Sequence, residues 1–281
     1  MRKARFSDLK SLARIYNDSK RELGEEDALD WLEAVLKARS RRVLVLVSEV
    51  AGRIVGFIVA YKKRSRAYVD AIAVDREYRG MGIGKTLLSE LESRLATQGV
   101  EEIYLSVKSW NTSALDFYLR NGYSVKGVVF VMRATADRIR AEHVAGYVVS
   151  DVSAKYTRKY KVLPTTWWSM LVEDVDMLIY KKFYKVERTI VVKKSKRVKA
   201  VATYSLNNEL VVDSILLACY SELEALKVLL NALKQVASAN QAKTIKVPVD
   251  ASKKQLVKAL EELGFRIEES EYLLYKNISE Y

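Results

Sequence analysis

The sequence has only one cysteine, Cys219, and only one histidine, His143. A single cysteine excludes a disulfide within the chain, and the grouped cysteines and histidines that usually bind zinc are missing. We therefore expect no metal, and we expect His143 to have a structural role. Only 2 prolines and 11 glycines occur in 281 residues, which argues against long disordered linkers.

Long apolar runs are missing as well. No stretch approaches the roughly 20 apolar residues that a membrane-spanning helix needs, and no apolar run typical of a secretory signal follows residues 1–6. We expect a soluble, cytoplasmic protein without a membrane partner. Apolar residues make up 49% of the chain. This share is enough for full hydrophobic cores, and the length fits two domains of roughly 130 to 150 residues.

The net charge of +13 is distributed over the chain, with +7 on residues 1–135 and +6 on the rest. Part of the second share lies in a basic run at residues 181–199, which aromatic and apolar residues interrupt. Such a run can contact nucleic acid or an acidic partner. More often it is the solvated face of two paired strands, so we do not favour nucleic acid as a partner.

Residues 68–74 form an apolar, β-branched run that predicts a buried strand. A loop with alternating glycines follows, and then a helix whose leucines share one face. The glycines are Gly80, Gly82 and Gly84, and the leucines are Leu87, Leu88, Leu91 and Leu95. The free amides and the dipole of a helix N-terminus favour an anion, and glycines let the backbone approach a phosphate. Arg79 and Lys85 bracket this loop with positive charge.

Two nucleotide-binding motifs fail on their spacing. The residues Gly84-Lys85-Thr86 resemble the end of a P-loop, but that motif needs a glycine at position 79, which is arginine. The G-x-G-x-x-G pattern of dinucleotide-binding proteins also fails, because the third glycine comes one position too early. A glycine turn without a ligand is the plain alternative to a phosphate site.

Two stretches resemble signatures of the GNAT N-acetyltransferase superfamily. Residues 79–84, Arg-Gly-Met-Gly-Ile-Gly, are similar to the R/Q-x-x-G-x-G/A signature. Residues 111–123 are similar to N-x-x-A-x-x-F/L-Y-x-x-x-G-F/Y, and the matching positions are Asn111, Ala114, Phe117, Tyr118, Gly122 and Tyr123. Asn111 suits a helix N-cap, and Gly122 suits a left-handed C-terminal stop.

The predicted order of elements also matches this family. We expect helices at 7–17 and 27–38, strands at 43–47, 54–61 and 68–74, a helix at 86–95, a strand at 103–107, a helix at 111–121 and a strand at 123–133. The resemblance implies an α/β (α+β mixed sheet) GNAT acyltransferase fold. In that fold the two strands beside the glycine loop splay apart and admit the pantetheine arm of acetyl-CoA.

The resemblance also implies how acetyl-CoA is held and used. The strand backbone would pair with the pantetheine arm, the loop amides would bind the pyrophosphate, and Tyr118 would be the general acid toward the thiolate. The coenzyme-binding residues implied are Ile72, Ala73, Val74, Arg79, Gly80, Met81, Gly82, Ile83, Gly84, Lys85, Asn111 and Tyr118. A phenol is protonated at neutral pH, which suits a proton donor. A buried tyrosine that only packs in the core is the alternative.

Asp70 is the candidate general base. It shares one face of the predicted strand with Ile72 and Val74, because side chains alternate along a strand. Family members often carry an acidic residue on this strand that deprotonates the amine through water. Alternatively, Asp70 lies in solvent or pairs with Arg66. Glu101 and Glu102 are weaker candidates.

The second half repeats the first at a constant offset of 142 residues. Apolar positions fall on apolar positions; for example, Ile103 falls on Ile245 and Leu91 on Leu233. The site residues are lost, because the counterpart of the glycine loop, residues 221–227, has no glycine and two glutamates. We therefore expect a catalytic domain at 1–135, a connector at 136–165 and a degenerate GNAT-like domain without coenzyme at 166–281.

These observations predict an acetyl-CoA-dependent N-acetyltransferase that acts by direct attack of a primary amine. The acceptor is open between protein or peptide amines and small-molecule amines. An acidic cluster at residues 22–30 could attract a basic acceptor, or it is a solvated helix start. A non-catalytic acyl-CoA-responsive binding protein, whose basic second domain contacts nucleic acid, is the rival hypothesis. Tyr118 argues against the rival, since binding alone needs no acid for the thiolate.

Overall fold

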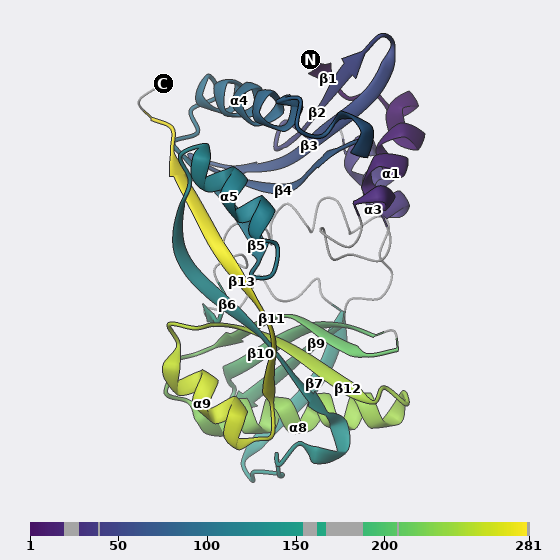
Figure 1. The fold of residues 1–281 in the computed structure, drawn as a ribbon. Coiled ribbons are helices and arrows are strands. Elements are labelled where there is room, and N and C mark those ends of the chain that lie inside the picture. The colour runs from purple at the N-terminus through teal and green to yellow at the C-terminus, as the bar shows by residue number, and fades with distance from the viewer. Residues whose placement is uncertain (20–27, 39, 154–161, 167–187, 207, 280–281) are drawn as a thin grey trace. The chain divides into compact units, whose positions relative to one another are not determined.

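The computed structural model describes residues 1–19, 28–38, 40–153, 162–166, 188–206 and 208–279 (Figure 1). The described chain divides into two compact units. The first unit contains residues 1–126 and 272–279, and the second contains the residues between them. The C-terminal residues therefore belong to the same unit as the N-terminal ones.

The first unit has a mixed sheet in the strand order β1-β2-β3-β4-β5-β13. Its strands are β1 (Arg2–Lys3), β2 (Val43–Val50), β3 (Arg53–Lys63), β4 (Arg66–Val74), β5 (Glu102–Lys108) and the end of β13 (Arg266–Asn277). Its helices are η1 (Phe6–Asp8), α1 (Leu9–Asp18), α3 (Ala28–Lys37), η2 (Arg76–Tyr78), α4 (Ile83–Ala96) and α5 (Thr112–Arg120). This order confirms the predicted one for residues 7–121.

Strand β3 lies in the middle of this unit, and both of its faces are buried. Ile58 and Ala60 pack in the cluster that contains the leucines of α4. Tyr61 accepts a hydrogen bond from Trp31 of α3. The sheet is therefore covered by helices on two sides, and this explains why β3 reads as a continuous apolar run in the sequence.

Strands β4 and β5 separate, as the family resemblance implied. Their parallel pairing runs from Arg66 and Glu102 to Val69 and Leu105, and it stops there. Strand β4 continues to Val74. On its other side β4 stays paired with β3, and the register shifts so that Asp70 has no direct partner on β3. Asp70 is thus the extra residue of a β-bulge, at the point where the two strands part.

The second unit has the strand order β6-β12-β11-β10-β9-β7, and β8 pairs with β11. Its strands are the second part of β6 (Ser124–Thr135), β7 (Tyr147–Ser153), β8 (Leu163–Pro164), β9 (Arg188–Lys194), β10 (Arg197–Leu206), β11 (Leu210–Leu217), β12 (Thr244–Asp250) and the first part of β13. Its helices are η3 (Ala136–Arg138), α8 (Leu223–Ala239) and α9 (Lys254–Glu262). Helices α8 and α9 share one hydrophobic core with this sheet.

The internal repeat is visible in the element boundaries. Strand β12, helix α9 and strand β13 begin and end 142 residues after β5, α5 and β6, the offset being 244 minus 102 for the first pair. Gly264 also has a positive φ, as its counterpart Gly122 has. The fold is therefore duplicated, as the sequence predicted.

The compact units differ in two respects from the expected division at residues 135 and 166. Strand β7 lies in the stretch expected as a connector, and it pairs with β9 in the sheet of the second unit. Residues 272–279 belong to the first unit rather than to the second. The reason is that β6 and β13 each contribute one part to each unit. The acidic residues 22–27 lie outside the described residues.

Candidate functional site

The glycine loop leads directly into helix α4. Gly80 and Gly82 have φ angles of +80° and +79°, a conformation that side chains rarely adopt, and Gly82 is the N-cap of α4. A Cβ atom at either glycine would point into open space. Gly84 is different, because a Cβ atom built on it would lie in van der Waals contact with the ring of Phe117 on α5, at 3.6 Å. Gly80 and Gly82 therefore serve an open left-handed turn, and Gly84 faces α5.

The backbone amides of residues 80–85 donate no hydrogen bond to any other described residue, whereas the next amide, that of Thr86, bonds the Gly82 carbonyl at 3.0 Å. All six residues precede α4 or lie in its first turn, where amides lack a partner in the helix. The side chain of Lys85 is exposed beside them. This arrangement fits an anion such as a pyrophosphate.

Arg79 has a different place from the one we expected for a phosphate ligand. Its guanidinium donates to the Val74 carbonyl at 3.1 Å and to the buried Ser19 hydroxyl at 2.8 Å. Arg79 thus connects the loop to the end of β4 and to the C-terminus of α1. In this position its side chain holds the loop in place.

The backbone of Ile72, Ala73 and Val74 lies beyond the last pair between β4 and β5. These residues pair with Ile58, Phe57 and Gly56 of β3 on one side. On the other side no residue of β5 pairs with them. In a strand with one paired edge, every second residue turns its N–H and C=O groups toward the open edge. The open edge therefore offers hydrogen-bonding groups to an extended ligand.

Tyr118 lies on α5 and is buried, with 6% of its surface exposed. Its ring packs against those of Phe117 and Tyr123, at centroid distances of 5.1 and 5.5 Å. Its hydroxyl donates no hydrogen bond to any described residue. Burial raises the pKa of Tyr118 well above its ordinary value. Helix α5 begins as predicted, since Asn111 accepts a hydrogen bond of 3.1 Å from the Ala114 amide.

Asp70 is held by a relay of two aromatic residues that sequence reasoning did not identify. The Tyr61 hydroxyl donates to Asp70 at 2.7 Å, and the indole nitrogen of Trp31 donates to the Tyr61 oxygen at 3.0 Å. Trp31 and Tyr61 are buried. Arg66, the alternative partner that the sequence suggested for Asp70, pairs with Glu102 at 2.7 Å.

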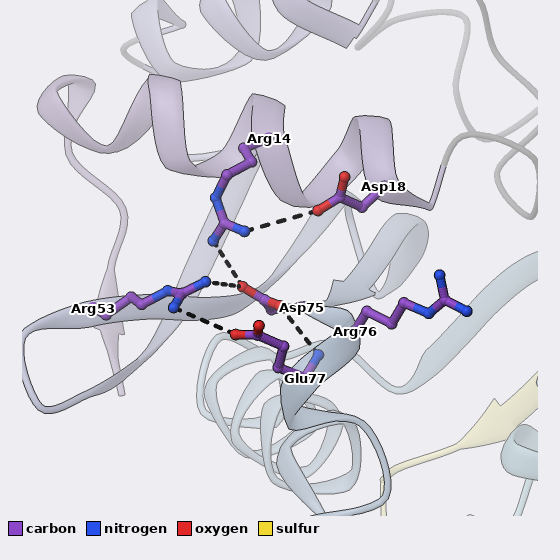
Figure 2. A pocket seen from close by; sticks show the side chains of 6 residues that line it. All are labelled: Arg14, Asp18, Arg53, Asp75, Arg76 and Glu77. Atoms are coloured by element: carbon purple, nitrogen blue, oxygen red, sulfur yellow. Dashed lines mark hydrogen bonds and ion pairs between the residues drawn. The ribbon is translucent and has the colours of Figure 1, made fainter.

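A pocket of about 300 Å³ lies before the loop, between α1, the β2–β3 hairpin and η2 (Figure 2). The carboxylate of Asp75 is only 3% exposed and accepts hydrogen bonds from Arg14 at 2.8 Å and Arg53 at 3.0 Å. Burial acts to raise its pKa, but the bonds from Arg14, from the Glu77 amide and the charge of Arg53 lower it overall. Three arginines and three acidic residues line the pocket, so their charges cancel. The ion pairs of Asp75 with Arg14 and Arg53 hold the end of β4 in place.

In the described part of the basic run, residues 188–199, three of the six lysines and arginines form ion pairs within their own unit. Arg188 pairs with Asp151 at 3.0 Å, Lys194 with Glu224 at 3.4 Å, and Lys199 with Glu222. Residues 181–187 lie outside the described part of the chain. These pairs lower the positive field that nucleic acid would need.

The described residues contain neither a cluster of metal-binding side chains nor a helix suited to crossing a membrane. No group of three or more histidine, cysteine, aspartate or glutamate side chains is placed to hold a metal ion. Among the same residues, no helix combines the length and the apolar character that crossing a bilayer requires.

Comparisons with known proteins agree with this geometry. Residues 9–123 match the model of the acetyltransferase (GNAT) family. Acetyltransferase SG1711 of Sodalis glossinidius (strain morsitans) is 34% identical over 89 residues, which make up 32% of this chain and 63% of that protein. The chain therefore spans less than two thirds of this curated relative.

Solved structures resemble the whole chain. A tandem GNAT protein from the clavulanic acid biosynthesis pathway has a TM-score of 0.71 at 13% identity, with 98% of this chain and 97% of that chain covered. A GCN5-related N-acetyltransferase from Sphaerobacter thermophilus has a TM-score of 0.67 at 16% identity, with 99% and 95% covered. Residues 9–123 thus match the GNAT family, and the whole chain has the fold of a tandem GNAT protein.

Proposed function

We propose that the first unit is an acetyl-CoA-dependent N-acetyltransferase that moves an acetyl group to a primary amine by direct attack. One observation carries the proposal: β4 and β5 stop pairing at Val69 and Leu105, beside a helix N-terminus whose amides donate to no described residue. An extended thioester with a pyrophosphate needs these two features side by side, a strand edge for its arm and an anion site for its phosphates.

Acetyl-CoA would be held mainly by backbone. The amides of residues 80–85 would bind the pyrophosphate, with Lys85 as a nearby cation, and the open edge of Ile72–Val74 would pair with the pantetheine arm. Asn111, as the N-cap of α5, would fix the start of the helix that carries Tyr118. Backbone groups suit this task because they are rigid, so little freedom is lost when the thioester binds.

Our proposed reaction needs one proton acceptor and one proton donor. The amine nitrogen attacks the carbonyl carbon of the thioester, a C–N bond forms and the C–S bond breaks. Asp70 takes a proton from the amine, directly or through a water molecule, and Tyr118 gives its proton to the departing sulfur. The bond from Tyr61 to Asp70 supports the first role, because it fixes the carboxylate at the bulge. The raised pKa of Tyr118 supports the second, because the hydroxyl keeps its proton at neutral pH.

The acceptor of the proposed reaction is a primary amine, either on a protein or peptide or on a small molecule. The acidic residues that could attract a basic acceptor lie mostly outside the described part of the chain. Of that cluster the structure describes Asp30, which is exposed on α3. A panel of amines is therefore needed.

Calorimetric titration of the full chain with acetyl-CoA tests the first step, and release of free thiol with a panel of amines tests the second. We expect one coenzyme site per chain and thiol release that depends on a primary amine. Absence of binding contradicts the proposal. Binding without turnover for peptide, protein and small-molecule amines supports the rival hypothesis of a non-catalytic acyl-CoA-binding protein.

A further inference from the structure

The second unit keeps the separated strand pair of the first. Strands β11 and β12 are the counterparts of β4 and β5, and they pair in parallel only at Leu210 with Ile245 and at Val211 with Lys246. Strand β11 nevertheless continues to Leu217, and β12 continues to Asp250. The second unit therefore has the same kind of opening between two strands.

A short segment of the same unit, residues 162–166, lies in this opening. Leu163 and Pro164 pair antiparallel with Leu217 and Leu216 of β11. The next residue, Thr165, connects both strands, because its amide donates to the Ile215 carbonyl at 2.9 Å and its carbonyl accepts from the Asp250 amide at 2.9 Å. One residue thus spans the gap between β11 and β12.

Side chains fix the segment further. The Thr165 hydroxyl donates to the Ile215 carbonyl at 3.0 Å, and the Tyr220 hydroxyl donates to the Pro164 carbonyl at 2.7 Å. Thr165 is 3% exposed and Thr166 is 2% exposed. The segment is therefore buried and hydrogen-bonded, in contrast to a loop that only covers the opening.

The positions that bind the segment correspond to those proposed for the pantetheine arm. At the offset of 142 residues, Ile215 is the counterpart of Ala73, and Leu216 is the counterpart of Val74. The segment thus pairs in the second unit with the strand edge that, in the first unit, extends beyond the pairing with β5.

The counterpart of the glycine loop in the second unit, residues 221–227, and its neighbours also make contacts within the unit. Glu222, at the N-cap of α8, pairs with Lys199. Lys253 lies 4.5 Å from the centre of the Tyr220 ring, and Tyr220 itself binds the segment. Negative charge at this helix N-terminus also repels a phosphate.

We infer that residues 162–166 permanently occupy the opening between β11 and β12, which corresponds to the proposed pantetheine-binding cleft of the first unit. In this position they exclude a second coenzyme. The comparison with a coenzyme cleft rests on the proposed function of the first unit, whereas the seating of the segment does not. A peptide strand here satisfies the open edges of β11 and β12, which otherwise would lie unpaired in a buried cleft.

Thiol accessibility on the full chain tests this inference. In a Cys219→Ser background, Thr165→Cys places a thiol at the buried centre of the segment. Leu163→Cys, which replaces a side chain that is 46% exposed, is the matched control two residues away. We expect the Thr165→Cys thiol to react with a water-soluble disulfide reagent at least about a hundredfold more slowly than the control, since it reacts only when the segment opens.

Two outcomes of the thiol experiment overturn the inference. Equal, fast reaction of both thiols means that the segment does not stay in the cleft. Fast reaction of Thr165→Cys only at saturating acetyl-CoA means that a coenzyme displaces the segment.

Hydrogen exchange of the unaltered chain is an independent test that needs no variant. We expect slow exchange of the Thr165 and Asp250 amides, and exchange at the rate of an unfolded peptide contradicts the inference. Failure of the first unit to bind acetyl-CoA leaves these measurements unchanged, so the two proposals are tested separately.

Discussion

The Tyr61 hydroxyl donates a 2.7 Å hydrogen bond to the carboxylate of Asp70, and the same oxygen accepts one from Trp31. Tyr61 therefore acts as donor and acceptor at once, between a helix and the bulge of β4. The indole has only one polar hydrogen, and Tyr61 satisfies it in a buried place. The relay links the orientation of Asp70 to the packing of α3.

Replacement of Tyr61 by phenylalanine should weaken both function and stability. The indole N–H of Trp31 would be buried without its acceptor, which costs about 1–3 kcal/mol of unfolding free energy. If Asp70 is the base, the acidic limb of the pH–rate profile should move to higher pH, because a donor that favours the charged carboxylate is lost. Urea unfolding and a pH–rate profile of the same variant measure the two effects.

A double variant separates the role of Tyr61 in positioning Asp70 from its role in core packing. The double variant Trp31→Phe with Tyr61→Phe removes both polar groups, so it should recover part of the stability without restoring the pH profile. A Tyr61→Phe variant with an unchanged pH–rate profile would separate Tyr61 from the chemistry and leave it a purely structural role.

Replacement of Tyr118 by phenylalanine should reduce turnover and little else. The lost hydroxyl bonds no described residue, so the free energy of unfolding should change by less than about 0.5 kcal/mol. Loss of a general acid should lower kcat by roughly 10²- to 10⁴-fold at unchanged coenzyme affinity. Because burial raises the pKa of Tyr118, the unaltered chain should lose none of the proposed activity through this group up to about pH 10. Tyr123→Phe, in the same aromatic cluster, is the control, and equal losses in both variants would remove the acid role.

Replacement of Gly82 by glutamate should abolish tight coenzyme binding. Gly99 provides a matched control, because its φ of +75° is similar to the +79° of Gly82 and a Cβ at either position meets open space. Gly82→Glu and the control Gly99→Glu therefore carry similar backbone strain, of the order of 1 kcal/mol. Only Gly82→Glu adds negative charge to the proposed phosphate site, so acetyl-CoA affinity should fall by at least about tenfold in that variant alone. Similar affinities in the two variants would locate the phosphates elsewhere.

Much of the fold could be predicted because the sequence repeats its own pattern. The apolar periodicity gave the element order, and the constant offset gave the duplication, which the boundaries of β12 and α9 confirm. Capping was also local enough to predict, as Asn111 and Gly122 demonstrate. These features depend on residues close together in the sequence.

Contacts between distant residues could not be predicted. Arg79 reads as a phosphate ligand within its motif, but its guanidinium reaches Ser19, 60 positions away. Tyr61 reads as a core aromatic within an apolar strand, and no local pattern predicts that its hydroxyl donates to Asp70, 9 positions away. The sequence did not predict a strand at Thr165, because the segment pairs with the edges of two strands that are distant in the sequence. Such residues obtain their roles from tertiary structure.

The buried carboxylate of Asp75 should make stability depend on pH. Its pKa is lowered in the folded chain, since the bonds from Arg14 and the Glu77 amide outweigh burial. A lowered folded-state pKa gives a stabilising contribution that is complete above the ordinary value near 4 and is lost as the pH falls through the folded value. Asp75→Asn should therefore destabilise the chain by about 1–3 kcal/mol near neutral pH, and the difference should shrink below about pH 4. Urea unfolding between pH 3 and 7 measures both effects.

Asp18 provides the control in the same pocket. Its side chain is 49% exposed and its oxygen lies 3.8 Å from Arg14, so solvent screens the pair. Asp18→Asn should change the free energy of unfolding by less than about 0.5 kcal/mol across the pH range. If Asp18→Asn and Asp75→Asn destabilise the chain equally, net charge rather than the buried brace at the end of β4 sets the pH dependence. If only Asp75→Asn does so, and its effect fades in acid, the bonds from Arg14 and Arg53 hold the strand that leads into the glycine loop.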